Sequence, residues 1–239
     1  TVADASPNAL HGTISGSPTR GVAAPHGFAT HFSSSGTSDR ISLPRQALHG
    51  LSTVSVSFWI NTTTTGEQAV VSGARAGADN EFLLFFGSHT EFRTYFHGVI
   101  TTWTIPSIAT GTWRHVVVRS NATNNQTTLY LDGVSMGTKS TSAGGASFSI
   151  DPGGLIIGQE QDSVGGGYTA SQRLVARLDD LRIYDVELTA TEIAELYGHR
   201  GHWAFDNGSG STISDSSYFA NHASFYTGNP SWTAGRRSH

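Results

Sequence analysis

Short apolar runs recur along most of the chain, and stretches rich in Gly, Ser, Thr and Asn separate them. Runs of this length, with many β-branched and aromatic residues, predict strands rather than helices. The run 113–119 and the run 127–131 are predicted to pair as a β-hairpin, and the second run ends at Asp132-Gly133, a dipeptide typical of tight turns. Together the runs predict an all-β sandwich, with its clearest strands at residues 54–61, 81–86, 113–119, 127–131 and 174–184.

One segment follows a helical pattern instead. Thr189 and Glu192 have the spacing of an N-terminal capping box, and Ile193 and Leu196 would lie on one face of the following turns. Gly198 stands where such a helix would end. The sequence therefore predicts one short helix near residues 189–197, placed on the sandwich.

The two ends of the chain resemble each other. Residues 1–6 (Thr-Val-Ala-Asp-Ala-Ser) are similar to residues 212–217 (Thr-Ile-Ser-Asp-Ser-Ser), and His11 and His222 follow Asp4 and Asp215 at the same spacing. This predicts a repeat of about 211 residues, in which 1–200 form one domain and 201–239 begin a second copy of a tandem array. The apolar segment 202–205 (His-Trp-Ala-Phe) has no counterpart before Thr1, so a second interpretation is that a strand at 201–206 completes the first domain.

Composition narrows the possible environments and partners. Only 13% of the residues are charged and the net charge is −4. This composition does not predict the basic surface with which proteins bind nucleic acid or an anionic membrane. No apolar run approaches the roughly 20 residues that span a bilayer, and Thr1 opens no signal peptide. The chain has no cysteine, which excludes disulfides and thiolate zinc sites. We expect a soluble, processed part of a secreted or cell-surface protein.

Two segments carry candidate chemistry and a family resemblance. Residues 157–167 (Ile-Gly-Gln-Glu-Gln-Asp-Ser-Val-Gly-Gly-Gly), followed by 171–175 (Ser-Gln-Arg-Leu-Val), resemble the calcium loop of pentraxins. Residues 79–85 (Asp-Asn-Glu-Phe-Leu-Leu-Phe) resemble the pentraxin segment that supplies the other calcium ligands. Residues 1–200 as a whole are similar to laminin-G-like, concanavalin A-like domains. The resemblance implies an antiparallel two-sheet jelly roll.

The resemblance also implies a ligand set. Carried over residue by residue, it assigns Asp79, Asn80, Glu160, the backbone carbonyl of Gln161, Asp162 and Gln172 to Ca²⁺. Such oxygens suit this ion, which takes six to eight ligands from carboxylates, amides, carbonyls and water. Three carboxylates without a metal would repel one another and raise at least one pKa. The alternative interpretation is a surface turn with acidic residues that binds no metal.

The departures from the family limit what the site is expected to bind. Thr169 stands where pentraxins carry a further glutamate, so we expect one calcium ion and a weakened second site. Phe85 matches the phenylalanine of choline-binding pentraxins, but Ile100 stands near the position of their glutamate, which disfavours phosphocholine. A glycan, or another polyol or anionic ligand, is the better expectation. Tyr168, beside the loop, is a candidate platform for a sugar ring, and Tyr95 and Trp103 are weaker candidates.

Three functions remain open at this point. The first is a calcium-dependent carbohydrate-binding module that neighbours other domains of the same polypeptide. The second is a structural or adhesive spacer repeat whose calcium only stiffens a loop. The third is a glycan-active enzyme, for which Glu160 and Asp162 would be the acid pair, but Gly165 stands where a third acid is expected. We predict a binding module without catalytic residues.

Overall fold

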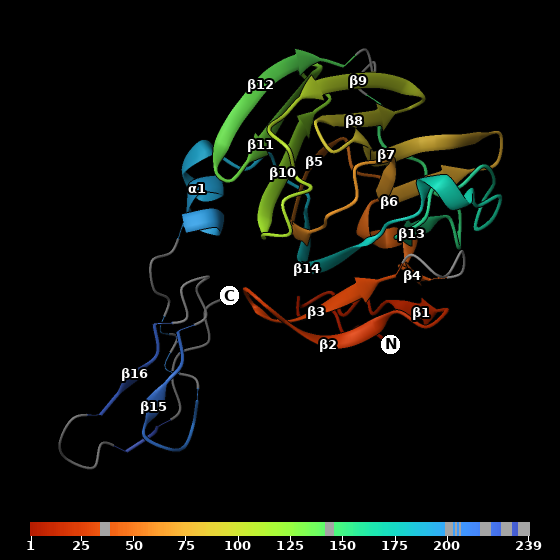
Figure 1. Ribbon diagram of the computed structural model, residues 1–239. Helices are drawn as coiled ribbons and strands as arrows, with labels where there is room; N and C mark the ends of the chain where they lie inside the picture. The colour runs from red at the N-terminus through yellow and green to blue at the C-terminus, as the bar shows by residue number, and fades with distance from the viewer. Residues whose placement is uncertain are drawn as a thin grey trace.

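Two antiparallel sheets form the body of the molecule (Figure 1). The computed structural model describes residues 1–33, 39–141, 146–198, 203, 205, 207–215, 221–225 and 231–233. Within these residues the first sheet has seven strands, in the order β1 (Thr13–Ser15), β4 (Arg40–Ser42), β13 (Leu155–Ile157), β6 (Gln68–Arg75), β7 (Ala78–Ser88), β8 (Glu91–Phe96) and β9 (Val99–Thr104). The second, also of seven described strands, has the order β12 (Val134–Ser140), β11 (Gln126–Leu131), β10 (Arg114–Asn121), β5 (Thr53–Asn61), β14 (Ala176–Tyr184), β3 (Gly27–Phe32) and β2 (Thr19–Ala24).

The core lies between the facing sheets. Side chains alternate between the two faces of a strand, so every second residue points inward. Phe58 of β5 and Phe82 and Leu84 of β7 are almost completely buried in one continuous cluster. The predicted antiparallel two-sheet jelly-roll sandwich is therefore confirmed.

The predicted hairpin and helix are both present. Strands β10 and β11 pair in antiparallel register, and Asp132-Gly133 turns the chain from β11 into β12 with positive φ at both residues. Helix α1 (Ala190–Gly198) begins after a capping box in which the amide of Glu192 donates to Thr189 Oγ1 and the amide of Thr189 donates to Glu192 Oε2. Leu188 and Ile193 pack on the outer face of β10 and β11. Short 3₁₀ turns, η1 (Arg45–Ala47) and η2 (Ala170–Gln172), complete the sandwich.

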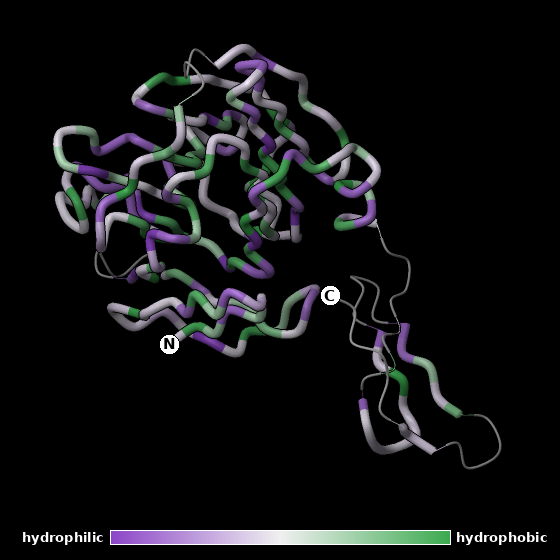
Figure 2. The backbone as a smooth tube through the Cα atoms, turned by 180° about the vertical axis from the view of Figure 1, so that it is seen from behind, coloured by the Kyte–Doolittle hydropathy of each residue, from purple (hydrophilic) through white to green (hydrophobic). Residues whose placement is uncertain are grey.

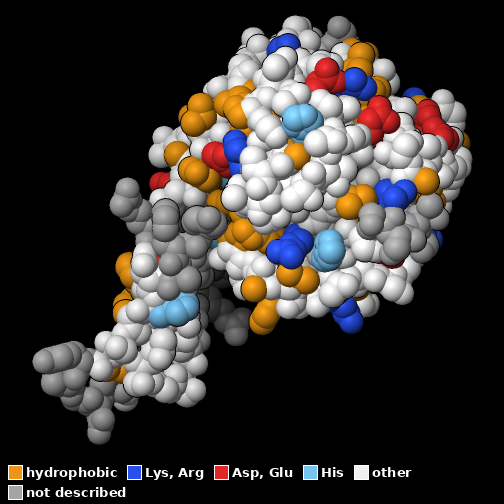
Figure 3. Space-filling model, in the orientation of Figure 1, with side chains coloured by type: hydrophobic (Ala, Val, Ile, Leu, Met, Phe, Trp, Pro, Cys, Tyr) orange, Lys and Arg blue, Asp and Glu red, His pale blue; other side chains and the backbone are white. Residues whose placement is uncertain are grey.

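The C-terminal segment lies beside the sandwich with its own small strand pair, β15 (Thr212–Ile213) and β16 (Ala223–Ser224) (Figures 1 and 2). Acidic and basic side chains are interspersed on the face of the molecule seen in Figure 3, without a large area of one sign. No helix in the described part of the chain is long and apolar enough to cross a membrane.

Candidate metal centre

The topology brings the two predicted ligand segments together. Strand β6 pairs with β13 on one side and with β7 on the other. Arg75, at the end of β6, is opposite Ala78 at the start of β7, while Gly73 is opposite Leu155 of β13. The loop that follows β13 starts beside Val70, where the amide of Gly158 donates to the Val70 carbonyl. It then folds back along β6, since the Gln161 side chain donates to the carbonyls of Ser72 and Gly154, and so reaches the residues that open β7.

Three carboxylates converge there. Asp79, Glu160 and Asp162 each offer a carboxylate oxygen, and these atoms all lie within 4.8 Å of one another. Asp79 is half-buried, Glu160 is buried and Asp162 is exposed, so the group spans from the protein interior to solvent. A single divalent cation could contact all three carboxylates.

Among these three carboxylates, Glu160 has the least favourable environment for its ionised form when no cation is bound. Its side chain is only 4% exposed, and no described residue donates a hydrogen bond to its Oε2 atom. Burial, followed by the charges of Asp162, Asp79 and Glu67, raises the pKa of Glu160 to about 7. A buried carboxylate without donors loses its hydration and gains nothing in return. A hard cation would supply the missing compensation.

Gln161 holds the loop in place. Its side chain is completely buried, and Nε2 donates hydrogen bonds to the carbonyl oxygens of Ser72 and Gly154 and to Ser72 Oγ, each at 3.0 Å. Its Oε1 atom accepts a hydrogen bond from the amide of Gly165 at 2.8 Å. These bonds fasten the loop to β6 without involving any of the three carboxylates.

Gly167 lets the loop pass close to Asp162. Its φ is +73°, a conformation that residues with a Cβ rarely adopt, and a Cβ at this position would lie 2.8 Å from Asp162 Cβ. The loop therefore requires glycine here for two independent reasons. Glycine at this position therefore allows the loop to fold back past Asp162.

A shallow hollow opens beside the carboxylates. Its wall includes Asp79 and Asp162, together with Arg75, Ala76, Gly77, Ala78, Ser163 and Val164. Arg75 lies over it, 44% exposed at the side chain, and its Nε atom is 3.1 Å from Glu81 Oε2. Glu81 is buried, and its other oxygen accepts a hydrogen bond from the amide of Ser149 and lies 2.9 Å from His97 Nδ1. Glu81 is thus satisfied by protein donors, in contrast to Glu160.

The remaining predicted ligands lie in the same two segments. Asn80 follows Asp79, its Nδ2 atom is 3.5 Å from Asp79 Oδ2, and its Oδ1 atom is buried without a hydrogen-bond partner among the described residues. Gln172 is half-buried in η2, where its amide donates to the carbonyl of Thr169. Thr169 itself is exposed.

The aromatic candidates have different positions. Phe85 also belongs to β7 but is only 2% exposed and packs against Leu83 and Tyr95, so its ring is not presented to solvent. Tyr168 is half-buried, donates its hydroxyl to the carbonyl of Gly165, and carries the Arg40 guanidinium over its ring. Burial raises the pKa of its hydroxyl. Trp103 is 1% exposed and packs in the core.

Sequence reasoning missed three contributors to the site. Ser72 anchors Gln161, Glu67 adds negative potential at Glu160, and Arg75 brings a cation to the hollow. Only Arg75 carries a local signal, because it lies four residues before Asp79, where the matched segment begins. The other two become visible only when β6 is placed beside β13.

Comparison with known proteins agrees with this architecture. The profile of the laminin-G-like family described as the concanavalin A-like lectin/glucanases superfamily matches residues 35–194. Human Pentraxin-4 is 31% identical over 152 residues, a match that covers 61% of this chain and 31% of the relative. The chain thus spans less than a third of that protein's length.

Two solved structures illustrate the fold. A heptameric SAP-like pentraxin from Limulus polyphemus superimposes with a TM-score of 0.57 at 24% identity, covering 63% of this chain and 72% of that one. Domain 4 of AbnA, an extracellular arabinanase from Geobacillus stearothermophilus solved with arabinotriose, superimposes with a TM-score of 0.61 at 18% identity, covering 82% and 93% of the two chains. The pentraxin resemblance seen in the sequence is confirmed, and the proteins compared are pentraxins and a carbohydrate-bound domain.

Proposed function

Because the chain belongs to the concanavalin A-like lectin/glucanases superfamily, we propose that it is a calcium-dependent carbohydrate-binding module of a secreted or cell-surface protein. The observation that carries the proposal is the buried Glu160 carboxylate, whose Oε2 atom has no hydrogen-bond partner among the described residues, within reach of Asp79 and Asp162. A buried charge without compensation costs several kcal/mol or is neutralised by a shift of its pKa.

The donor set favours a hard cation such as calcium over zinc or copper. The cluster offers only carboxylate oxygens, and the neighbouring Asn80 and Gln172 add amide oxygens. Oxygen ligands of this kind suit Ca²⁺, whereas zinc and copper sites use histidine or cysteine. The Glu160, Asp162, Asp79 and Asn80 side chains, with Gln172 and the Gln161 carbonyl, would hold the ion, and Thr169 adds no charge for a second one.

The hollow beside the cluster supports a small polar ligand. A bound calcium ion supplies open coordination positions that the vicinal hydroxyls of a sugar can fill. Arg75 would donate hydrogen bonds from the wall of the hollow, and the short side chains of Ala76 and Ala78 leave room for a ring. The complex of the AbnA domain with arabinotriose makes this neutral trisaccharide a reasonable first probe.

The first experiment measures calcium without a ligand. Chelator-treated protein is titrated with Ca²⁺ in a calorimeter, and thermal unfolding is followed with and without the ion. We expect the wild-type chain to bind calcium and gain thermal stability, and Asp162→Asn to lose both effects. Asp185→Asn, which removes an exposed carboxylate outside the cluster, is the matched control and should behave like the wild type. Equal behaviour of all three proteins would contradict the proposal.

The second experiment measures the ligand. Arabinotriose and an array of neutral and acidic glycans are presented in calcium and in chelator. Glycan binding that requires calcium and is lost in Asp162→Asn supports the binding module. Calcium binding without any glycan binding would favour the structural spacer.

A further inference from the structure

The two similar ends of the chain share a hydrogen-bonded structure as well as a sequence. The amide of Asp4 donates to His11 Nδ1 at 3.0 Å, and the amide of Asp215 donates to His222 Nδ1 at 3.0 Å. In each segment the aspartate Oδ2 accepts a backbone amide at 2.7 Å, from Leu10 in the first and from Asn221 in the second. A shift of 211 residues therefore carries one set of bonds onto the other.

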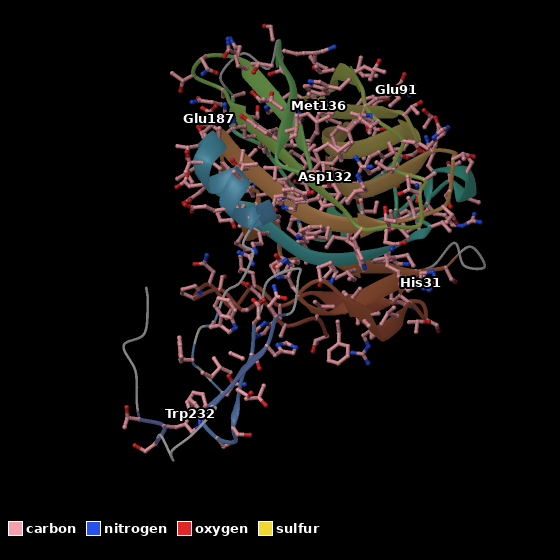
Figure 4. All side chains as sticks on the ribbon, turned by 60° about the vertical axis from the view of Figure 1, so that its left-hand side comes forward. His31, Glu91, Asp132, Met136, Glu187 and Trp232 are labelled. Atoms are coloured by element: carbon pink, nitrogen blue, oxygen red, sulfur yellow. The ribbon has the colours of Figure 1, made fainter. Side chains whose placement is uncertain are left out.

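The strand pairing repeats at the same shift. Val2 and Gly12 form an antiparallel bridge, with both backbone hydrogen bonds at 2.9 Å. The equivalent residues, Ile213 and Ala223, are paired in β15 and β16. Matching side-chain hydrogen bonds and matching strand register in segments so far apart indicate that the C-terminal segment is the opening of a second copy of the fold. Trp232 lies in this segment, away from Asp132 and Met136 of the sandwich, and its indole donates to the carbonyl of Gly210 at 3.1 Å (Figure 4).

The second segment makes one further contact among its described residues. Trp203 forms an antiparallel bridge with Asp215, and its indole N–H donates to the carbonyl of Asn221 at 2.9 Å. Asp215 is consequently only 4% exposed, whereas its counterpart Asp4 is half-buried. Within the described residues, no hydrogen bond reaches the Leu10 carbonyl, which is the counterpart of the Asn221 carbonyl.

We infer that the strand around Val2–Asp4 is an acceptor edge for a strand of the His-Trp-Ala-Phe type, the lead-in segment of this protein's own repeat. The bridge between Trp203 and Asp215 gives the register, which would place the tryptophan of the added strand opposite Asp4. Its indole would then donate to the Leu10 carbonyl. Pairing along an exposed strand edge satisfies backbone groups that otherwise rely on water, and the tryptophan adds apolar burial.

The repeat spacing defines the experiment. A copy of residues 201–211 is fused directly before Thr1 of the full chain, so that the first copy receives the same lead-in at the same distance as the second. The matched control is the same fusion with alanine in place of the added tryptophan. Hydrogen exchange of the Val2–Gly12 amides, tryptophan emission and molecular mass in solution are measured for both proteins and for the original chain.

We expect the fusion to slow exchange of the Val2–Gly12 amides by about tenfold or more, because opening would then also break the added pairing. The emission of the added tryptophan should shift to the blue, and the alanine control should exchange like the original chain. If exchange slows only as the protein dimerises, the edge is filled by the strand of a second molecule, which also supports the inference. Identical exchange and emission of a water-exposed tryptophan in the fusion would overturn it. Calcium binding is measured in parallel, so failure here is distinguishable from failure of the proposed function.

Discussion

The replacement Glu160→Gln tests the electrostatic reasoning about the site, because it should change stability in opposite directions with and without calcium. The buried carboxylate has its pKa raised from 4.5 to about 7 by burial and by neighbouring acids. This rise corresponds to a cost of roughly 3 kcal/mol for the ionised form in the metal-free folded protein. An amide of the same shape removes the charge, so the variant should be more stable than the wild type in chelator by up to this amount.

The pH dependence has a defined sign. Since the folded pKa lies above the unfolded value, the folded protein binds the proton more tightly, and its stability falls as pH rises from about 4.5 to about 7. The advantage of the variant in chelator should therefore be largest at pH 8 and absent below about pH 4.5. In calcium the order should reverse once the ion is in about a thousandfold excess over Kd, because binding then stabilises the wild type by about 4.1 kcal/mol, more than the cost of the buried charge.

Urea unfolding at pH 8 and pH 4.5, in chelator and in millimolar calcium, measures both effects. Glu195→Gln removes an exposed glutamate from α1 and serves as the control, which should follow the wild type. The reasoning would be refuted if the variant were less stable than the wild type in chelator. It would also be refuted if calcium raised the unfolding free energy of the variant as much as that of the wild type.

Three further predictions concern the loop, the core and the helix. Gly167→Ala should weaken calcium binding by about tenfold or more, because it adds strain at positive φ and a contact with Asp162, whereas Gly50→Ala, at φ +89° with nothing within 4 Å, should leave calorimetric calcium binding unchanged. Burial lowers the pKa of His115 from 6.5 to about 3, with His26 and Arg182 contributing. The folded state therefore resists protonation, and stability should fall by up to about 1.4 kcal/mol per pH unit as pH drops from 6.5 toward 3. Between pH 7 and pH 5, the free energy of unfolding measured in urea should fall less for His115→Gln than for the wild type. Thr189→Ala removes the cap of α1 and should cost about 1 kcal/mol in the same assay at neutral pH, and an unchanged midpoint would argue against the capping box.

Much of the fold could be predicted because the strand signals are local. The runs at 54–61 and 127–131 coincide closely with β5 and β11, and the capping spacing predicts α1. Both sheets needed the family resemblance, since alternation along one strand does not say which strand lies beside it. The three-residue strand β13 was not predicted, because a run as short as 155–157 gains its strand character only from pairing with β4 and β6.

The sequence names the three carboxylates that the structure brings together, but it does not predict the surface around them. A period of two separates the faces of β7, but it does not say whether the outer face is covered. Leu83 and Phe85 are buried on that face by packing with Ala69 and Tyr95, so a ring expected near a ligand lies inside a hydrophobic cluster. Burial of the outer face of a strand depends on the loop and the strands that pack against it. The residue pattern along that one strand does not reveal these neighbours.

Gln161 shows why the physical basis of the site requires the structure. The family resemblance assigns its backbone carbonyl to the metal, while the structure gives its side chain a second task, fastening the loop to Ser72 and Gly154. Because these bonds use the Gln161 side chain and none of the three carboxylates, they fasten the loop independently of the metal ligands. Ion binding would then have to compensate mainly for the dehydration of the ion and for the charge on Glu160, and little for chain entropy. A loop without such an anchor should bind calcium more weakly for the same number of carboxylates, because ordering the loop would then cost chain entropy.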